Sequence, residues 1–393
     1  MSSKLDIIVL GATGFTGRLT CRYLLRKPEL KGRWGMGGRS QAKLDALKKE
    51  IGAVDVPTFV ADATIPSTLD AACAKTKCVI ACSGPYTLVG MPVVEACMRN
   101  GTHYVDTTGE FNFVRQVIEK YHDEAIKKKI TVVPCCGFAA VPPDMGNYTV
   151  HREAGEEVKV VKGYIDLCAA GVSNGTVNSV ATAIENMTKE DFSPLSLVAK
   201  DGVQPTATPV HRGIWYENRR LIGYTIGAGA DERIVRRSNS LLRSSAVYVE
   251  STQGPFLRVL GSTLVFYAVG IVLSIGPLRR WLINRYFTGT SVGPTDHSMS
   301  HSSFHCNFVG ETVSGKRVET TLSGKDDCYS ATATFLVESA LSLLALEGKK
   351  KLKSGVLTPA SAFGDELVRR LRDSGITIDT VVSGGSSSAK KVQ

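Results

Sequence analysis

Apolar and polar positions change their spacing regularly along the first 135 residues. Short apolar runs are followed by segments in which apolar residues recur every three or four positions, a pattern typical of a strand followed by an amphipathic helix. The spacing suits right-handed crossovers and predicts a doubly wound α/β domain. The expected strands are 5–10, 33–37, 58–61, 78–82, 103–106 and 130–134, and the expected helices are 16–27, 41–51, 67–74, 92–100 and 111–129.

The pattern changes after residue 134. The run PCCGFAAVPPDMG contains three prolines and two glycines, which favours a rigid interdomain passage over residues 134–155 rather than another helix. A second domain follows this passage. Its strand-like segments are 158–169, 244–250, 303–309 and 317–322, and its helix-like segments are 177–187 and 331–346.

The first apolar run leads directly into a glycine-rich turn, GATGFTG. Such turns also occur without a ligand, but here a buried strand precedes the turn and a helix follows it, which is the context of a dinucleotide site. Gly11 permits the tight turn, Gly14 lets the backbone approach phosphates, and Gly17 lets the helix lie close to the sheet. The free amides and the dipole of that helix would then face an anion.

The end of the second strand indicates which dinucleotide is bound. An NAD enzyme places an acidic residue about 20 residues after the glycines, but this chain has Arg39 and Ser40 there. A guanidinium binds a 2′-phosphate bidentately, whereas a carboxylate repels it. We therefore expect NADP(H), with the alternative that Arg39 only lies on a surface turn before the next helix.

Loops after the other strands complete the expected cofactor site, because ligands bind at the carboxyl ends of the strands of such sheets. Asp62 is expected near the adenine and residues 82–86 near the nicotinamide. The cofactor-binding residues that we predict are Gly11, Ala12, Thr13, Gly14, Phe15, Thr16, Gly17, Arg39, Ser40, Asp62, Cys82, Ser83, Gly84, Pro85 and Tyr86.

Composition narrows the class of protein. The net charge of +10 comes from scattered basic residues without a nucleic-acid-binding motif, so we expect an anionic cofactor or an anionic membrane rather than nucleic acid. The ten cysteines include no C-x-x-C pair, which favours a reducing compartment. No signal-peptide pattern precedes the first strand, and we expect an intracellular protein.

Seven motifs together resemble one family: GATGFTG, GGRS, CSGPY, YVDTTGE, CCGFAAVPPDMG, SNGT and GVLTPASAF. In their order and spacing, over nearly the full length, the chain resembles the saccharopine dehydrogenase-like oxidoreductases. The resemblance implies a second α/β domain that carries a mixed sheet. The implied divisions are a Rossmann domain at 1–135, the second domain at 136–354 and a C-terminal segment at 355–382 that packs back on the first domain. Residues 383–393 form a polar stretch with too few apolar side chains to build a core, so we expect a disordered tail there.

The branch that the chain most resembles is found with membranes and lipid droplets in eukaryotes and is similar to bacterial trans-acting enoyl reductases of lipid synthesis. This resemblance implies an NADPH-dependent reductase of a lipid-related or other hydrophobic substrate. One alternative is a non-catalytic membrane or droplet protein that keeps the cofactor as a structural ligand. A true saccharopine reductase is a further alternative, although the amino-acid-binding residues of those enzymes cannot be matched here.

Hydride transfer often needs a nearby acid, and four residues are candidates. Tyr86, Asp106 and Glu110 follow strands of the first sheet, and Asp144 lies at the domain passage. Each could reach the crevice between the domains. Alternatively, Tyr86 only walls the nicotinamide and Asp144 only caps a helix after two prolines.

Three histidines, His297, His301 and His305, recur every four residues, a spacing that places them on one side of a helix or a strand. Serine and threonine fill the intervals, and no acidic residue is placed to orient the imidazole rings. We therefore expect no metal site.

A stretch of twenty uncharged residues, 259–278, separates Arg258 from the sequence Arg279-Arg280-Trp281, and thirteen of the twenty are apolar. As a helix it would be about 30 Å long, the thickness of a bilayer core. A simple span would separate parts of one domain, so we expect a hairpin or an in-plane insertion through 259–281. Both domains would then face the cytosol at a membrane or lipid droplet, with the mitochondrion as an alternative location. A buried core helix or an oligomer interface, as in a homodimer, stays open.

Overall fold

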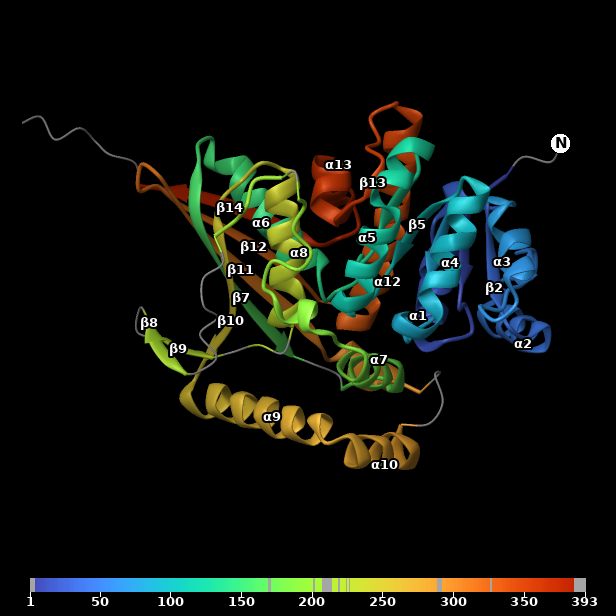
Figure 1. Ribbon diagram of the computed structural model, residues 1–393, viewed down its shortest axis with the longest axis horizontal. Coiled ribbons are helices and arrows are strands. Elements are labelled where there is room, and N and C mark those ends of the chain that lie inside the picture. The colour runs from blue at the N-terminus through green and yellow to red at the C-terminus, as the bar shows by residue number, and fades with distance from the viewer. Residues whose placement is uncertain are drawn as a thin grey trace, which may run out of the picture.

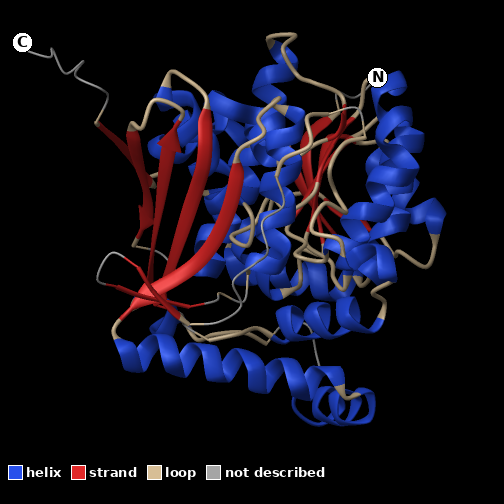
Figure 2. Cartoon of the chain, turned by 60° about the vertical axis from the view of Figure 1, so that its left-hand side comes forward, coloured by secondary structure: helices blue, strands red, loops and turns tan. Residues whose placement is uncertain are grey.

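Two seven-stranded sheets form the framework of the molecule (Figure 1). The computed structural model describes residues 4–168, 171–200, 202–206, 214–217, 220–223, 225, 227–287, 292–325 and 327–384. Figure 2 shows the two sheets on opposite sides, with helices between and around them. The predicted α/β class with a second, mixed-sheet domain is confirmed.

The first sheet is parallel throughout, in the order β13-β6-β5-β4-β1-β2-β3. Its central strands are buried on both faces, which explains why their sequences are almost continuous apolar runs. Its strands are β1 (Leu5–Leu10), β2 (Trp34–Gly38), β3 (Thr58–Val60), β4 (Thr76–Ala81), β5 (His103–Asp106), β6 (Thr131–Val133) and β13 (Gly355–Val356). The accompanying helices are α1 (Phe15–Leu25), α2 (Gln41–Ile51), α3 (Pro66–Cys73), α4 (Tyr86–Asn100) and α5 (Phe111–Lys128), with a short 3-10 helix, η1 (Pro28–Leu30).

The second sheet is mixed, in the order β14-β12-β11-β7-β10-β9-β8. Only β7 and β10 pair in parallel, and every other neighbouring pair is antiparallel. Its strands are β7 (Val158–Cys168), β8 (Trp215–Glu217), β9 (Arg220–Gly223), β10 (Val247–Gly254), β11 (Ser303–Thr312), β12 (Arg317–Gly324) and β14 (Thr377–Ser383). The helices of this half are α6 (Val141–Ala154), α7 (Asn174–Glu185), η2 (Lys189–Phe192), α8 (Ala228–Leu241), α9 (Phe256–Ser274), α10 (Gly276–Tyr286), α11 (Asp296–Ser300), α12 (Cys328–Gly348) and α13 (Pro359–Asp373).

The passage predicted over residues 134–155 is wrong, because most of it is the buried helix α6. Pro142 and Pro143 lie in the first turn, where a helix needs no amide hydrogens from them. Gly146 lets the helix approach the second sheet, since a Cβ there would lie 2.2 Å from the ring of Phe308. The prolines therefore begin a helix instead of preventing one.

The C-terminal segment contributes to both sheets. β13 pairs with β6 in the first sheet, which agrees with the expected packing of this segment on the first domain. β14, however, pairs with β12 along seven residues of the second sheet. The segment from residue 355 onward therefore joins the two domains rather than belonging to the first alone. The tail predicted at 383–393 lies outside the described residues from 385 onward.

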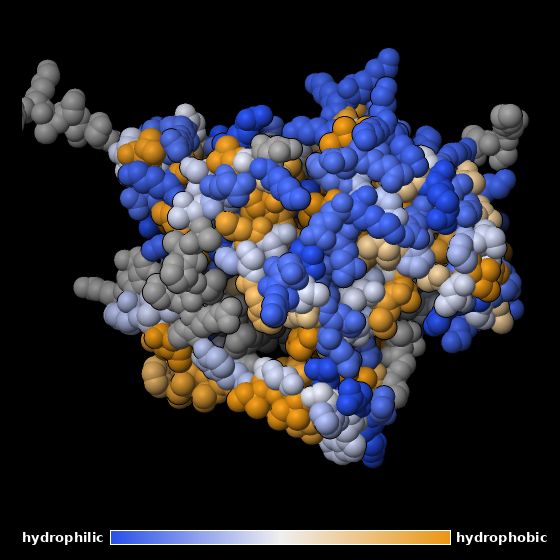
Figure 3. All heavy atoms as spheres, in the orientation of Figure 1, coloured by the Kyte–Doolittle hydropathy of each residue, from blue (hydrophilic) through white to orange (hydrophobic). Residues whose placement is uncertain are grey.

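The apolar stretch, for which a hairpin or an in-plane insertion was predicted, forms two helices, α9 and α10, with a break at Ile275. Only 18% of the most apolar part of α9 is buried, compared with 72% of α12. These are the two helices in the described part of the chain that are long and apolar enough to cross a membrane, by length and composition alone. Figure 3 shows apolar side chains gathered along the edge where Figure 1 places α9. The alternative of a buried core helix is therefore wrong for α9.

Candidate cofactor site and active site

The glycine-rich turn joins β1 to α1 and leaves no room for a side chain at Gly11 or Gly17. Gly11 has a φ of +80°, and a Cβ there would lie 2.3 Å from Oγ of Ser83. A Cβ on Gly17 would lie 2.1 Å from the carbonyl oxygen of Gly11. α1 begins after Gly14 with no side-chain cap and no acidic residue in its first turn. Its first amides are therefore available to an anion at the carboxyl end of β1.

The end of β2 presents a cation beside this turn. Arg39 is exposed, and Ser40 caps α2 by accepting a hydrogen bond of 3.4 Å from the amide of Lys43. Asp62 follows β3 and accepts hydrogen bonds from the amide and the hydroxyl of Thr64. These two bonds lower the pKa of Asp62, and the positive charge of Arg39 acts in the same direction. Arg39 and Asp62 thus share the edge of the sheet where the adenosine end of a dinucleotide would lie.

The loop of residues 82–86 lies between the glycine-rich turn and the second domain. Ser83 faces Gly11, as the close approach above shows, and Sγ of Cys82 lies 3.8 Å from Oγ1 of Thr20 on α1. On its other side, a Cβ on Gly84 would lie 3.0 Å from Oγ of Ser179 on α7. A cofactor ring beside this loop would therefore face α7.

Glu110, one of the four predicted proton donors, holds this loop in place. Its carboxylate accepts hydrogen bonds from the amides of Tyr86 (2.8 Å) and Thr87 (2.7 Å) and from the Thr87 hydroxyl (2.5 Å). These amides belong to the first turn of α4, so Glu110 caps that helix from a distance in sequence. The Tyr86 hydroxyl donates to the carbonyl oxygen of Ala81, and burial raises the pKa of Tyr86.

Asp106 and Asp144 are also buried and hydrogen-bonded within the protein. Asp106 accepts bonds from the Tyr104 hydroxyl and from the amides of Thr108 and Cys135, which ties the loop after β5 to the loop after β6. Burial raises its pKa to about 6, against the effect of these bonds. Asp144 accepts a bond of 2.8 Å from the amide of Ala360, at the start of α13, and burial raises its pKa to about 7.

The four candidates thus support loops and helix ends, and none is more than 4% exposed. Their role as proton donors stays a prediction.

The structure adds a residue that the sequence reasoning missed, Tyr329 in the first turn of α12. Its ring packs edge-on against Phe15 of the glycine-rich turn at 5.2 Å, and its hydroxyl accepts from the amide of Ser173. Only this long-range contact identifies Tyr329 as part of the crevice wall.

The histidines do not gather at one point. The rings of His297 and His301 stack at 4.6 Å, whereas His305 lies on β11. Within the described ranges, no group of three or more histidine, cysteine, aspartate or glutamate residues could hold a metal ion.

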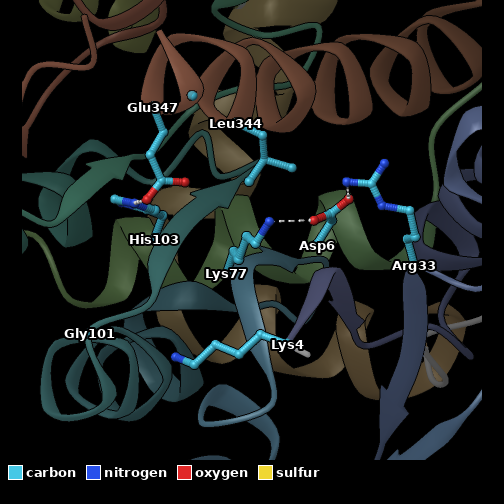
Figure 4. A pocket seen from close by; sticks show the side chains of 9 residues that line it. Lys4, Asp6, Arg33, Lys77, Gly101, His103, Leu344 and Glu347 are labelled. Carbon is cyan, nitrogen blue, oxygen red and sulfur yellow. Dashed lines mark hydrogen bonds and ion pairs between the residues drawn. The ribbon is translucent and has the colours of Figure 1, made fainter. Parts of the chain in front are cut away.

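A cavity of about 460 Å³ lies at the opposite end of the first sheet, beside α12 (Figure 4). In this cavity Asp6 binds Arg33 (2.5 Å) and Lys77 (3.0 Å), and His103, whose pKa is lowered by burial, lies 3.3 Å from Glu347. Because it lies at the amino ends of the strands, it is separate from the crevice where ligands of such sheets bind.

Comparison with known proteins agrees with this geometry. Residues 7–133 match the family described as the saccharopine dehydrogenase NADP-binding domain. The chain is 32% identical over 409 residues to a protein of Mycobacterium tuberculosis named as a trans-acting enoyl reductase, covering 96% of this chain and 97% of the relative. A trans-acting enoyl reductase of Mycobacterium ulcerans is 30% identical over 410 residues, covering 95% and 97%.

Two solved structures share the fold. Saccharopine dehydrogenase (L-Glu forming) from Saccharomyces cerevisiae aligns with a TM-score of 0.54 and 15% identity, over 97% of this chain and all of that one. Homospermidine synthase from Legionella pneumophila, solved with NAD, aligns with a TM-score of 0.52 and 11% identity, over 99% and 94%. At these identities the structures show a common architecture.

Proposed function

The chain belongs to the saccharopine dehydrogenase-like family of NADP-dependent oxidoreductases, and from this premise we propose that it reduces a lipid-related or other hydrophobic substrate with NADPH at a membrane or lipid-droplet surface. The observation that carries the proposal is the presence, on one molecule, of a complete dinucleotide turn beside Arg39 and an exposed apolar helix. The relatives named as trans-acting enoyl reductases support an unsaturated acyl substrate.

The residues at the crevice fit NADP(H). The uncapped amides of α1 would bind the pyrophosphate, and the guanidinium of Arg39 would bind the 2′-phosphate. Glu110 keeps the loop of residues 82–86 in place by capping α4, so this loop can line one side of the nicotinamide site. When bound, the cofactor supplies the hydride for reduction.

The membrane part of the proposal depends on the surface of α9 and α10. Leu257, Leu264 and Ile271 are spaced seven residues apart on α9 and are 80%, 59% and 63% exposed. On α10, Trp281 and Tyr286 are also exposed, and their rings meet edge-on at 6.0 Å. Exposed large apolar side chains gathered on one surface are typical of an interaction site.

Charge favours a lipid surface as the partner of this face. The exposed Arg280 and Arg285 lie on α10 beside the aromatic residues, a combination typical of interfacial anchors. β10 before α9 and β11 after α10 belong to the same sheet, so the pair of helices would lie on a bilayer rather than span it. Both domains would stay on the cytosolic side, at a membrane or droplet, with a mitochondrial surface as the alternative.

The proposal is tested by NADPH oxidation with long-chain trans-2-enoyl thioesters and long-chain ketones, measured without vesicles and with neutral or anionic vesicles. We expect turnover of at least one substrate class, faster on anionic vesicles to which the protein sediments. A protein that binds NADPH but turns over none of these substrates would instead support the non-catalytic alternative. Concentration-dependent dimerisation without vesicle binding would assign the apolar face to a second copy of the chain.

A further inference from the structure

Two buried carboxyl groups meet in the second domain, away from the predicted acids. Asp231 lies in the first turn of α8 and Glu250 on β10, and they are 5% and 2% exposed. A Cβ on Gly227 would lie 2.5 Å from Oδ2 of Asp231 and 3.5 Å from Oε1 of Glu250. The two carboxyl groups therefore converge on the same glycine, which leaves the space for them.

Among the residues that the structure describes, no cation forms an ion pair with either carboxyl group. The neighbouring Arg236 is engaged by Glu232 at 2.8 Å, and the other oxygen of Glu232 accepts from the amide of Glu250. The Tyr248 hydroxyl donates to Oε2 of Glu250 at 3.2 Å. Oδ1 of Asp231 and Oε1 of Glu250 have no hydrogen-bond donor among the described residues. Two adjacent buried carboxylates without a cation cannot both be ionised, so they share a proton.

Burial is the main cause of the proton's retention. It raises the pKa of Glu250 to about 8, and the negative charge of Glu232 acts in the same direction. Burial, followed by the charge of Glu250, raises the pKa of Asp231 well above its usual range. The titratable and charged groups around the pair are Glu232 and Arg236 on α8, Tyr248 on β10, Cys306 on β11 and Cys135 after β6.

The pair lies on the side of the second domain that faces the first. Arg233, two residues after Asp231, stacks at 4.4 Å on Phe111, the first residue of α5 after the β5 loop. The pKa of Cys135, after β6, is raised by burial and then by the charges of neighbouring acids that include Asp231. Figure 1 shows α8 between the second sheet and α5. The carboxyl ends of β5 and β6, where the crevice opens, are therefore the nearest part of the first domain.

We propose that Asp231 and Glu250 hold one proton between them and donate it to the substrate during its reduction, an inference that rests on the proposed function. The proton goes to the substrate atom that becomes electron-rich when hydride, with its two electrons, is added from NADPH. The substrate gains two hydrogen atoms, NADPH becomes NADP⁺, and the pair is left with two negative charges. Water then returns a proton to the pair.

The pair differs from the four predicted acids in its arrangement. Asp106 and Glu110 each accept hydrogen bonds from two backbone amides, whereas the pair brings two carboxyl groups together, each with one oxygen that has no donor among the described residues. A proton shared by two carboxyl groups can leave one of them for a substrate, and a donor that titrates near the working pH is efficient in general acid catalysis. Gly227 keeps the space beside the two carboxyl groups free of a side chain.

Infrared titration of the NADPH-free protein tests for the shared proton directly. The measurement uses an Asp144→Asn background, which removes the other carboxyl group whose pKa lies near neutrality. We expect a protonated-carboxyl band that weakens as the pH rises through about 8 and that is absent when Asp231→Asn and Glu250→Gln are combined. The matched control is Glu338→Gln in the same background, which should keep the band, because Glu338 is equally buried but lies 2.6 Å from Lys27 and 3.5 Å from Arg370. Absence of the band in this background, or its persistence when both carboxyl groups of the pair are replaced, would overturn the proposal.

NADPH fluorescence and single-turnover reduction of a trans-2-enoyl thioester separate this inference from the proposed function. We expect Glu250→Gln and Asp231→Asn each to bind NADPH within about twofold of the wild type and to reduce the thioester about 100- to 10,000-fold more slowly. Normal NADPH binding with undiminished reduction would overturn the role of the pair alone. Failure of the wild type to bind NADPH would overturn the proposed function, and with it this role.

Discussion

At the crevice, the choice of residue at several positions is set by the space that neighbouring backbone leaves rather than by a reactive group. Gly11 and Gly17 are required because a Cβ at either position collides with neighbouring atoms. Glu110 and Asp106 were predicted from their position after a strand, and the sequence places them correctly at the carboxyl end of the sheet. The partners that tie them to other loops, Tyr86, Thr87 and Cys135, lie more than 20 residues away, so sequence alone could not show this supporting role.

Gly11→Ala should weaken NADPH binding at least tenfold, whereas Gly32→Ala should leave it unchanged. Both glycines have a left-handed φ, +80° and +71°, so both substitutions cost about 1–2 kcal/mol in backbone strain. Only at Gly11 does the added Cβ also meet Ser83 and the backbone of Cys82. Thermal unfolding measures the loss of stability caused by backbone strain, and NADPH fluorescence measures the loss of binding. Equal losses of binding in both variants would contradict the close-approach argument.

Asp144→Asn should alter the pH dependence of stability. The pKa of Asp144 is raised to about 7 in the folded protein, so the folded state binds more protons than the unfolded state between about pH 4 and pH 7. Its contribution to stability therefore falls as pH rises through this window, by up to about 4 kcal/mol. Relative to the wild type, the variant should gain stability over the same window in urea unfolding. The exposed Asp55→Asn should show no such trend.

At the scale of elements, periodicity predicted the first sheet well because its strands are buried on both faces and its helices are amphipathic. β1, β5 and α2 begin and end at the predicted residues. Three of the longer helices were missed, each for a physical reason. α6 begins with two prolines, α13 changes direction at Gly364 with a φ of +47°, and α8 is rich in charged residues. The charges of α8 are nevertheless buried, since Arg237 donates to the carbonyl oxygens of Leu197 and Val356.

Replacing Leu257, Leu264 and Ile271 of α9 together by serine should reduce binding to anionic vesicles at least 100-fold. Each side chain is exposed in the protein and would contribute about 1.5–3 kcal/mol if buried in lipid. Because exposed positions affect folding little, the unfolding midpoint should stay close to that of the wild type. Val54→Ser, at an apolar side chain that is 71% exposed elsewhere, is the matched control. Unchanged vesicle sedimentation of the triple variant would exclude α9 as the lipid-binding element.

In the whole molecule, the cofactor half of the site could be located from the sequence, but the arrangement of the second domain could not. The cofactor half of the site lies within one continuous stretch of alternating strands and helices, so spacing alone could locate Gly11, Arg39 and the loop of residues 82–86. The second sheet pairs strands that are distant in sequence, such as β7 with β11 and β12 with β14. Asp231 and Glu250 lie on consecutive elements, α8 and β10, and meet because this helix packs on this strand, which the local sequence pattern did not predict.

The central claim is that the crevice holds a dinucleotide whose extra phosphate is bound by Arg39. Calorimetric titration of the wild type, Arg39→Ala and the control Arg26→Ala with NADPH and NADH tests this claim most directly. Arg26 is exposed at the far end of α1. We expect the wild type and Arg26→Ala to prefer NADPH, and Arg39→Ala to lose about 10- to 100-fold in NADPH affinity without loss of NADH affinity, because a charge-assisted contact contributes about 1.5–3 kcal/mol. No binding heat with either coenzyme, or equal NADPH affinity in all three proteins, would contradict it.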